Sequence, residues 1–388
     1  MMLKKIINYG KAEVLNNEKE KLAIYPDLRN LFWETTLRCN EKCKHCGSRA
    51  GECDTLKDEL TTNEIKKAFK DVSEKINPNN ILINVTGGEP LLRNDLFDVM
   101  DYAHNELGFR WGITTNGLLI NEDVIKQMKK TGLATMSISL DGMKETHDKF
   151  RGVPGAFDKT INNIKKLQND KFLKAFQITT VVNKMNINQL DEMYHLMKDL
   201  EVDSWRIINM DPIGRAQDNN ELALDKNDYI HLFEFMKNKN KESNFQITYG
   251  CAHYLGINRE YSIRNFGFFC FAGFTVASIL YNGDIYVCPD VERREDLIQG
   301  NVKVDNFADI WFNGFEWFRN LDKFKTGKCS TCSEWKYCRG DSLHTWDFEN
   351  NKPKLCLKNL LYEKGEINEY NRVNLYGSSE LEELGLLE

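Results

Sequence analysis

The chain has 388 residues, of which 41% are hydrophobic and 28% are charged, a composition typical of a globular protein with one large and one smaller domain. Its 52 Lys and Arg residues are outnumbered by 58 Asp and Glu residues, and the net charge of −6 argues against a nucleic-acid partner, which would need a basic surface. Because the sequence shows neither a signal peptide nor an apolar run of roughly 18 residues, we expect a cytoplasmic protein without a membrane partner.

Residues 31–245 alternate short β-branched runs with amphipathic segments, and residues 1–30 form an extension before them. The amphipathic segments repeat apolar residues at steps of three and four, which predicts helices with one buried face. Thr61 and Glu64 form a capping box before one of these helices, and Asn121 caps another. Six strands are predicted, at 31–37, 81–86, 111–115, 135–140, 176–182 and 205–210.

Six successive βα units predict an α/β fold, a partial (β/α)6 TIM-like barrel with parallel strands at 31–245. In such a barrel the carboxyl ends of the strands gather on one face, and ligands bind there. An open, doubly wound sheet would produce the same local pattern, and periodicity alone does not separate the two architectures.

A second, small domain is predicted at 246–360, where the alternation stops and cysteine, glycine and aromatic residues become dense. A small domain with a thin apolar core needs additional cross-links for stability, and metal clusters can supply them. The tail at 361–388 is acidic and carries several leucines, so we expect a surface helix with a frayed end.

The eleven cysteines are poor candidates for a disulfide framework, because the cytosol keeps thiols reduced, and metal ligation is the favoured interpretation. Three of them, Cys39, Cys43 and Cys46, lie in one loop directly after the first predicted strand. Three thiolates leave one iron of a cubane cluster open to a small molecule. A structural zinc site completed by His45 or Cys53 is the alternative.

The CxxxCxxC spacing of this loop resembles the radical S-adenosylmethionine (SAM) superfamily, and the segments TGGEPLLR, TTNG, SISLDG and HDKFRG are similar to it as well. The resemblance implies that Cys39, Cys43 and Cys46 hold a 4Fe–4S cluster whose open iron binds SAM. It also implies a reductive cleavage of SAM that yields methionine and a 5′-deoxyadenosyl radical, which takes a hydrogen atom from the substrate.

By the same resemblance, Gly87, Gly88 and Glu89 receive the amino group of SAM at the end of the second strand. The glycine pair would let the backbone approach the ligand without a Cβ in the way. A plain turn is the alternative interpretation of GGEP taken alone.

Two further segments are expected to contact SAM. Ser139, with Asp141 nearby, would face its ribose and carboxylate, and Arg151 would pair with the carboxylate, a task that suits a guanidinium better than an ammonium. Alternatively, Ser139 only caps a turn and Arg151 is a surface charge.

The later cysteines resemble the SPASM extension of radical SAM enzymes, which carries auxiliary iron–sulfur clusters and is common among peptide-modifying members. By resemblance, one auxiliary cluster has four thiolate ligands, although a four-cysteine zinc ribbon is an alternative. The implied ligands of that cluster are Cys329, Cys332, Cys338 and Cys356.

A second auxiliary site is expected around Cys251, Cys270 and Cys288. The sequence departs from the family pattern at Ser342, where a cysteine is usual, so this site has three thiolates and either an open iron or a ligand from residues near Ser342. The alternatives are a smaller site or none. The candidate ligands near that position are Asp341, Ser342 and His344, whereas Cys53 fits neither site and is interpreted as a simple thiol.

The resemblance favours a maturase that acts on a peptide or protein, making a thioether, a carbon–carbon crosslink or an epimerised residue in a ribosomal peptide. An electron donor such as flavodoxin or ferredoxin is implied. Because only residues 1–30 precede the first strand, a separate leader-peptide-binding protein is a further expected partner. The alternatives are small-molecule chemistry, such as tetrapyrrole side-chain decarboxylation, and a non-catalytic adaptor stabilised by its clusters.

Overall fold

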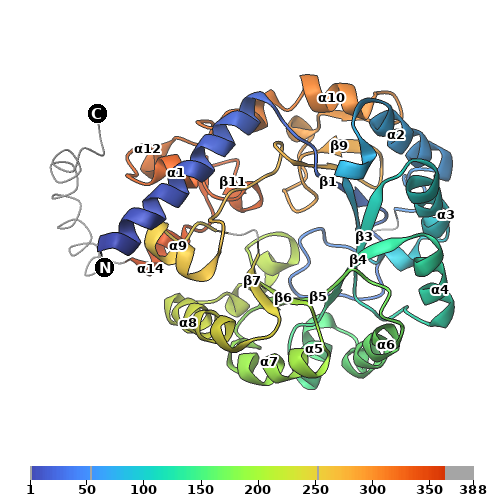
Figure 1. Ribbon diagram of the computed structural model, residues 1–388, viewed down its shortest axis with the longest axis horizontal. Coiled ribbons are helices and arrows are strands. Elements are labelled where there is room, and N and C mark those ends of the chain that lie inside the picture. The colour runs from blue at the N-terminus through green and yellow to red at the C-terminus, as the bar shows by residue number, and fades with distance from the viewer. Residues whose placement is uncertain (1, 53–54, 251–252, 363–388) are drawn as a thin grey trace.

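The computed structural model describes residues 2–52, 55–250 and 253–362. Its centre is a curved parallel sheet in which seven consecutive strands pair with their neighbours in chain order, with helices on the outside (Figure 1). The strands are β1 (Asn30–Glu34), β2 (Leu82–Thr86), β3 (Arg110–Thr115), β4 (Leu133–Ser139), β5 (Ala175–Val182), β6 (Ser204–Asn209) and β7 (Gln246–Tyr249).

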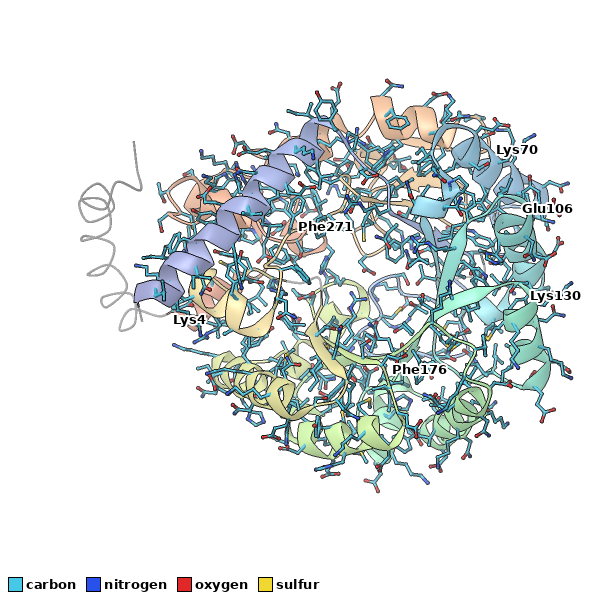
Figure 2. The ribbon with its side chains drawn as sticks, in the orientation of Figure 1. Lys4, Lys70, Glu106, Lys130, Phe176 and Phe271 are labelled. Carbon is cyan, nitrogen blue, oxygen red and sulfur yellow. The ribbon has the colours of Figure 1, made fainter. Side chains whose placement is uncertain are left out.

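The helices between these strands bury one apolar face each, as their periodicity predicts. The predicted capping box of Thr61 and Glu64 is present, and the Asn121 side chain accepts a hydrogen bond from Val124 N at 3.0 Å. Figure 2 shows Lys70 and Lys130 pointing outward, and Phe176 is buried. These outer helices are α2 (Thr62–Lys75), α3 (Leu96–Asp101), α4 (Glu122–Lys130), α5 (Lys144–Arg151), α6 (Ala156–Asp170), α7 (Leu190–Asp199) and α8 (Lys226–Glu242).

The predicted partial barrel is confirmed, and its sheet extends beyond the six predicted strands. All six are present, although the first ends at Glu34 rather than at residue 37. A seventh parallel strand, β7, is only four residues long, too short for its alternation to stand out in the sequence. The sheet therefore continues past residue 245, where the alternation of the sequence stops.

The cysteine-rich region adds three strands to the other end of the same sheet. Strand β8 (Val276–Ile279) pairs in parallel with β1, and β9 (Asp284–Tyr286) and β10 (Gly300–Asn301) follow it in antiparallel pairing. One continuous apolar cluster runs from the barrel into this region. The other elements here are α9 (Ile257–Ile263), α10 (Phe307–Asn313), α11 (Glu316–Arg319), α12 (Gly327–Ser330), α13 (Trp335–Cys338), α14 (Leu357–Leu361), β11 (Trp346–Asp347) and β12 (Lys352–Pro353).

The extension before the first strand forms the long helix α1 (Met2–Ile24), which lies across the cysteine-rich region (Figure 1). None of the helices in the described ranges has both the length and the apolar character needed to cross a bilayer. The surface helix predicted for the tail falls on 363–388, outside the described residues, apart from the end of α14.

Candidate active site

The cysteine loop follows β1 at the carboxyl end of the parallel strands. Desolvation raises the pKa of Cys39 to about 11 and that of Cys43 further above its usual range, and the nearby Cys46 thiol adds to both shifts. The structure thus brings the three predicted ligands into one partly buried loop. Burial makes free thiolates costly there, and a cationic metal cluster would remove that cost.

Helix α5 fixes one side of this loop. Lys42 N donates to Arg151 O at 3.1 Å and Lys44 N donates to Phe150 O at 3.0 Å. The His45 ring stacks on Phe150, with ring centroids 4.8 Å apart. The predicted HDKFRG segment therefore supports the loop through its backbone as well as its side chains.

The segment after β6 fixes the other side, and the sequence analysis did not identify it. Arg215 donates from Nε to Cys43 O at 2.8 Å, from Nη1 to Ala50 O at 2.9 Å, and from its backbone N to Cys46 O at 3.0 Å. Gly214 has φ +53°, and a Cβ there would lie 2.3 Å from Cys46 O. A glycine followed by an arginine after a barrel strand is too short a signal to have indicated this role.

The two glycines of GGEP make room for the chain's own backbone, a reason that the sequence did not indicate. Gly88 N donates to Thr36 O at 2.7 Å, and a Cβ on Gly88 would lie 2.1 Å from Arg38 O. Gly87 has φ +137°, and a Cβ there would lie 2.4 Å from Thr36 O. The glycines therefore let β2 approach the start of the cysteine loop, because no side chain fits between the two segments.

The Glu89 carboxylate joins two of the predicted segments. It is fully buried and accepts hydrogen bonds from Leu91 N at 3.1 Å, Thr115 Oγ1 at 2.8 Å and Asn116 N at 2.9 Å. Desolvation raises its pKa to about 7, even though these donors favour the ionised form. The GGEP and TTNG segments are thus connected directly by this side chain.

Arg151 is buried, so its alternative interpretation as a surface charge is wrong. Its Nη2 lies 2.5 Å from Asp141 Oδ2, and its Nη1 lies 3.3 Å from Glu41 Oε2 and 3.5 Å from Cys43 Sγ. Asp141 Oδ1 also accepts from Val181 N at 2.7 Å. Arg151 and Asp141 therefore form a buried ion pair against the cysteine loop, while Ser139 lies half-buried at the end of β4.

The four cysteines predicted for one auxiliary cluster lie in neighbouring elements of the cysteine-rich region. Cys329 lies in α12, Cys338 in α13, and Cys356 caps α14. Desolvation and then the charges of Asp341, Cys356 and Cys332 raise the pKa of Cys338. Lys358 Nζ donates to Cys332 Sγ at 3.5 Å.

The second predicted auxiliary site is described only in part. Cys251 and the unassigned Cys53 lie outside the described residues. Cys270 and Cys288 are half-buried against the apolar core, and Cys270 lines a small cavity together with Cys338. Among the described residues, no three Cys, His, Asp or Glu side chains converge tightly enough to hold a single metal ion.

Two of the candidate fourth ligands lie in a buried network that reaches the barrel. Asp341 accepts from His253 Nδ1 at 3.2 Å and from Tyr254 N at 3.0 Å. His253 Nε2 in turn lies 2.7 Å from Asp211 Oδ1, just after β6, and His344 Nε2 lies 3.1 Å from Asp211 Oδ2. This network links the carboxyl end of the barrel to the segment that carries Ser342, which is fully buried.

The profile described as the radical SAM superfamily matches residues 33–197, and the profile of the SPASM iron–sulfur cluster-binding domain matches residues 270–333. The AdoMet-dependent heme synthase of Methanosarcina barkeri is 32% identical over 329 residues, which are 80% of this chain and 90% of that protein. The chain belongs to the radical SAM superfamily. It is an enzyme with a SPASM domain, and the non-catalytic adaptor is excluded.

Other relatives of this radical SAM enzyme differ in substrate. The mycofactocin maturase MftC of Mycolicibacterium smegmatis is 30% identical, over 81% of this chain and 77% of that protein. SuiB of Streptococcus suis bound to S-adenosylmethionine has the same fold, with a TM-score of 0.63 and 20% identity over 81% of this chain and 73% of SuiB. The enzyme anSMEcpe with bound AdoMet and a peptide matches with a TM-score of 0.65 and 19% identity, over 92% and 99% of the two chains.

The cofactors of this radical SAM enzyme are a 4Fe–4S cluster with SAM and auxiliary iron–sulfur clusters. Its active-site residues fit SAM, because four buried polar atoms around the cysteine loop have no hydrogen-bond partner among the described residues. Such atoms are costly unless a ligand with polar groups satisfies them. They are Glu41 Oε1, His45 Nδ1, His147 Nε2 and Arg151 Nε.

Proposed function

We propose that this radical SAM enzyme is a maturase that takes a hydrogen atom from a peptide or protein and forms a thioether or carbon–carbon crosslink. The observation that carries the proposal is the SPASM domain together with 30% identity to the mycofactocin maturase MftC over 81% of the chain. The sheet supports it, because β7 and β10 are its two outer strands and do not pair with each other in the described part of the chain. An open sheet edge can accept an extended peptide as an added strand.

The residues that we propose for SAM binding lie in or beside the cysteine loop. Cys39, Cys43 and Cys46 hold the cluster, and Arg151 offers its unpaired Nε–H to the SAM carboxylate. The segment from Gly87 to Glu89 remains the candidate for the amino group, and Ser139 for the ribose. Because the Glu89 carboxylate and Asp141 Oδ1 already accept hydrogen bonds within the chain, we infer that these two side chains also position their segments.

A crosslink has a definite balance of atoms and electrons. When bound, the SAM cluster supplies the radical that removes one hydrogen atom from the substrate carbon. Bonding of that carbon to a cysteine sulfur breaks the S–H bond and releases one proton to solvent and one electron. An oxidised auxiliary cluster, when bound, would accept this electron and return it to the SAM cluster, which loses one electron when SAM is cleaved. Flavodoxin or ferredoxin would then supply only the electron that first reduces the enzyme. The auxiliary cysteines would therefore take part in turnover, by holding the cluster that accepts this electron.

The test is production of 5′-deoxyadenosine by the anaerobically reconstituted chain with dithionite and SAM. A short peptide encoded next to the gene should increase this production, and its mass should fall by two hydrogen atoms for each crosslink. The Cys46→Ala variant is the control and should produce none. If no neighbouring peptide is modified, with or without a separate leader-binding protein, the peptide assignment fails.

A second candidate is decarboxylation of a tetrapyrrole side chain, favoured by the 32% identity to an AdoMet-dependent heme synthase over 90% of that protein. An iron tetrapyrrole with propionate side chains, supplied in the same assay, would then increase 5′-deoxyadenosine production and lose carbon dioxide. Stimulation by the tetrapyrrole and not by the peptide would replace the first proposal with this one.

A further inference from the structure

The N-terminal helix α1 packs against α13, the segment that carries Cys338. Helix α1 lies outside the ranges that the two family profiles match. Glu13 accepts hydrogen bonds from Lys336 Nζ at 2.6 Å and from the Tyr337 hydroxyl at 2.5 Å. One helical turn later, Asn16 Oδ1 accepts from Arg339 Nη2 at 3.0 Å. These contacts share one face of α1, because residues three apart on a helix are neighbours.

The next residue on this face is Lys19, which is only 1% exposed. Its Nζ donates to Tyr337 O at 2.6 Å and lies 4.9 Å from the centre of the Phe269 ring. An ammonium has three donors, and Lys19 forms no ion pair with any described residue. A buried cation without a counter-ion is costly, so this position requires negative charge nearby.

The thiols on either side of Lys19 can provide that charge. Tyr337 directly precedes Cys338, and Phe269 directly precedes Cys270. Burial lowers the pKa of Lys19 to about 8, and the charge of Arg339 adds to this shift. The strongest opposing effect is the charge of Cys338, followed by the charges of Glu260 and Cys270. Both cysteines line the same cavity.

A second ammonium, on a half-buried lysine, lies on the cavity that Cys270 and Cys338 line. Lys323 lines it, and Lys323 Nζ donates to Phe318 O at 2.7 Å. Lys323 likewise forms no ion pair within the described ranges. Two cations without carboxylate partners thus lie beside cysteines predicted to hold auxiliary clusters.

An iron–sulfur cluster with four thiolate ligands carries net negative charge, and reduction adds one more negative charge. Net charge and hydrogen bonding around a cluster set its reduction potential. We propose that Lys19 is a positioning residue that raises the reduction potential of the auxiliary cluster held by Cys338. Helix α1 would then contribute to the function of that cluster site. A fixed positive charge stabilises the reduced cluster more than the oxidised one, whichever substrate the enzyme uses.

The test is a redox titration of the reconstituted full-length chain, followed by electron paramagnetic resonance. The auxiliary signal is the one that does not change when SAM is added. Lys19→Met removes the charge and the hydrogen bond, whereas Lys19→Gln removes the charge and keeps a donor for Tyr337 O. Both midpoint potentials should shift to more negative values by a similar amount, with iron per chain unchanged. Lys21→Met, on the exposed face of α1, should leave the midpoint at the wild-type value.

An unchanged midpoint in both Lys19 variants would overturn the proposal. A shift in Lys19→Met alone would also overturn it, because the hydrogen bond and not the charge would then be responsible. If Lys19→Met loses auxiliary iron, the midpoint potential of Lys19→Gln tests the proposal alone. Loss of auxiliary iron from both variants would show a structural role and would overturn the proposal. The measurement needs no substrate, so its failure is distinct from failure of the peptide assignment.

Discussion

Glu89 is a buried acid surrounded by hydrogen-bond donors, and two opposing effects act on it. Three donors stabilise its carboxylate, whereas desolvation disfavours the charge and is the larger effect, which raises the pKa to about 7. Between pH 4.5 and about 7, the folded chain therefore keeps a proton on this residue that the unfolded chain, with an ordinary pKa of 4.5, has already released. The stability of the enzyme should reflect this difference.

Replacing Glu89 by Gln should change how stability depends on pH. Between pH 4.5 and about 7 the folded wild-type chain binds more protons at this residue than the unfolded chain, so its stability falls as the pH rises through this window. The loss is at most about 3 kcal/mol and is complete above the folded pKa. Glu89→Gln lacks this component. Measured without SAM across the window, the thermal midpoint of the wild-type protein should fall relative to that of Glu89→Gln as the pH rises, and parallel curves would contradict the prediction.

The cysteine loop is positioned by three elements that are distant in the sequence. The turn after β2 contacts its start, α5 supports its middle, and the segment after β6 binds the backbone carbonyls of Cys43 and Cys46. These contacts are mostly backbone to backbone, which leaves little freedom for larger residues at the crossing points.

Gly88→Ala tests one crossing point directly. The new Cβ would lie 2.1 Å from Arg38 O, and neither backbone can move without breaking the hydrogen bonds that join them. We expect a loss of stability of about 2 kcal/mol or more, and a lower content of the SAM-binding cluster. Thermal unfolding and iron analysis of the reconstituted protein measure both effects.

Gly10→Ala is the matched control, because Gly10 lies inside α1 with nothing within 4 Å of a new Cβ. It should stabilise the protein by about 0.5–1 kcal/mol, since alanine favours a helix interior. Equal effects of the two substitutions would show that the turn after β2 tolerates a side chain.

The barrel and the cysteine-rich region are connected by buried charges as well as by a shared sheet. His253 lies between Asp211, which follows β6, and Asp341, which follows Cys338. Both carboxylates are buried, so the imidazolium between them compensates charge from both parts of the molecule.

His253→Leu should therefore destabilise the whole molecule. It leaves Asp211 and Asp341 buried with less compensating charge, at a cost of about 3 kcal/mol or more. His231→Leu, at an exposed position of α8, should change stability by no more than about 0.5 kcal/mol. Thermal midpoints of the two variants compare the effects, and a similar midpoint for both would mean that the network does not hold the two regions together.

The two groups of cysteines should also separate by iron content. Cys39→Ala should abolish SAM cleavage and leave the auxiliary iron in place. Cys332→Ala should lose iron and stability together, because its cluster would join the short segments that carry α12, α13 and α14. Iron per chain and thermal midpoints of both variants measure this. Equal iron loss in the two variants would contradict the assignment of the cysteines to separate sites.

Much of the local structure could be predicted because local sequence determines it. Apolar periodicity indicated the helices, and Thr61, Glu64 and Asn121 indicated where two of them begin. The short strand β7 was missed, since four residues are too few to show alternation. The spacing of Cys39, Cys43 and Cys46 pointed to the family, because all three predicted ligands lie in one short loop and their spacing can be read from the sequence.

The sequence by itself therefore determined the βα units and the family, and it indicated two groups of cysteines. Only the tertiary structure decided that Arg151 is buried against Cys43, that Arg215 holds the cysteine loop from 172 residues away, and that Lys19 reaches Tyr337 across 318 residues. Motif spacing and periodicity depend only on residues that are close along the chain, so the sequence alone can show them. Burial and pairing of charges depend on residues that meet only after the sheet has curved and α1 has docked.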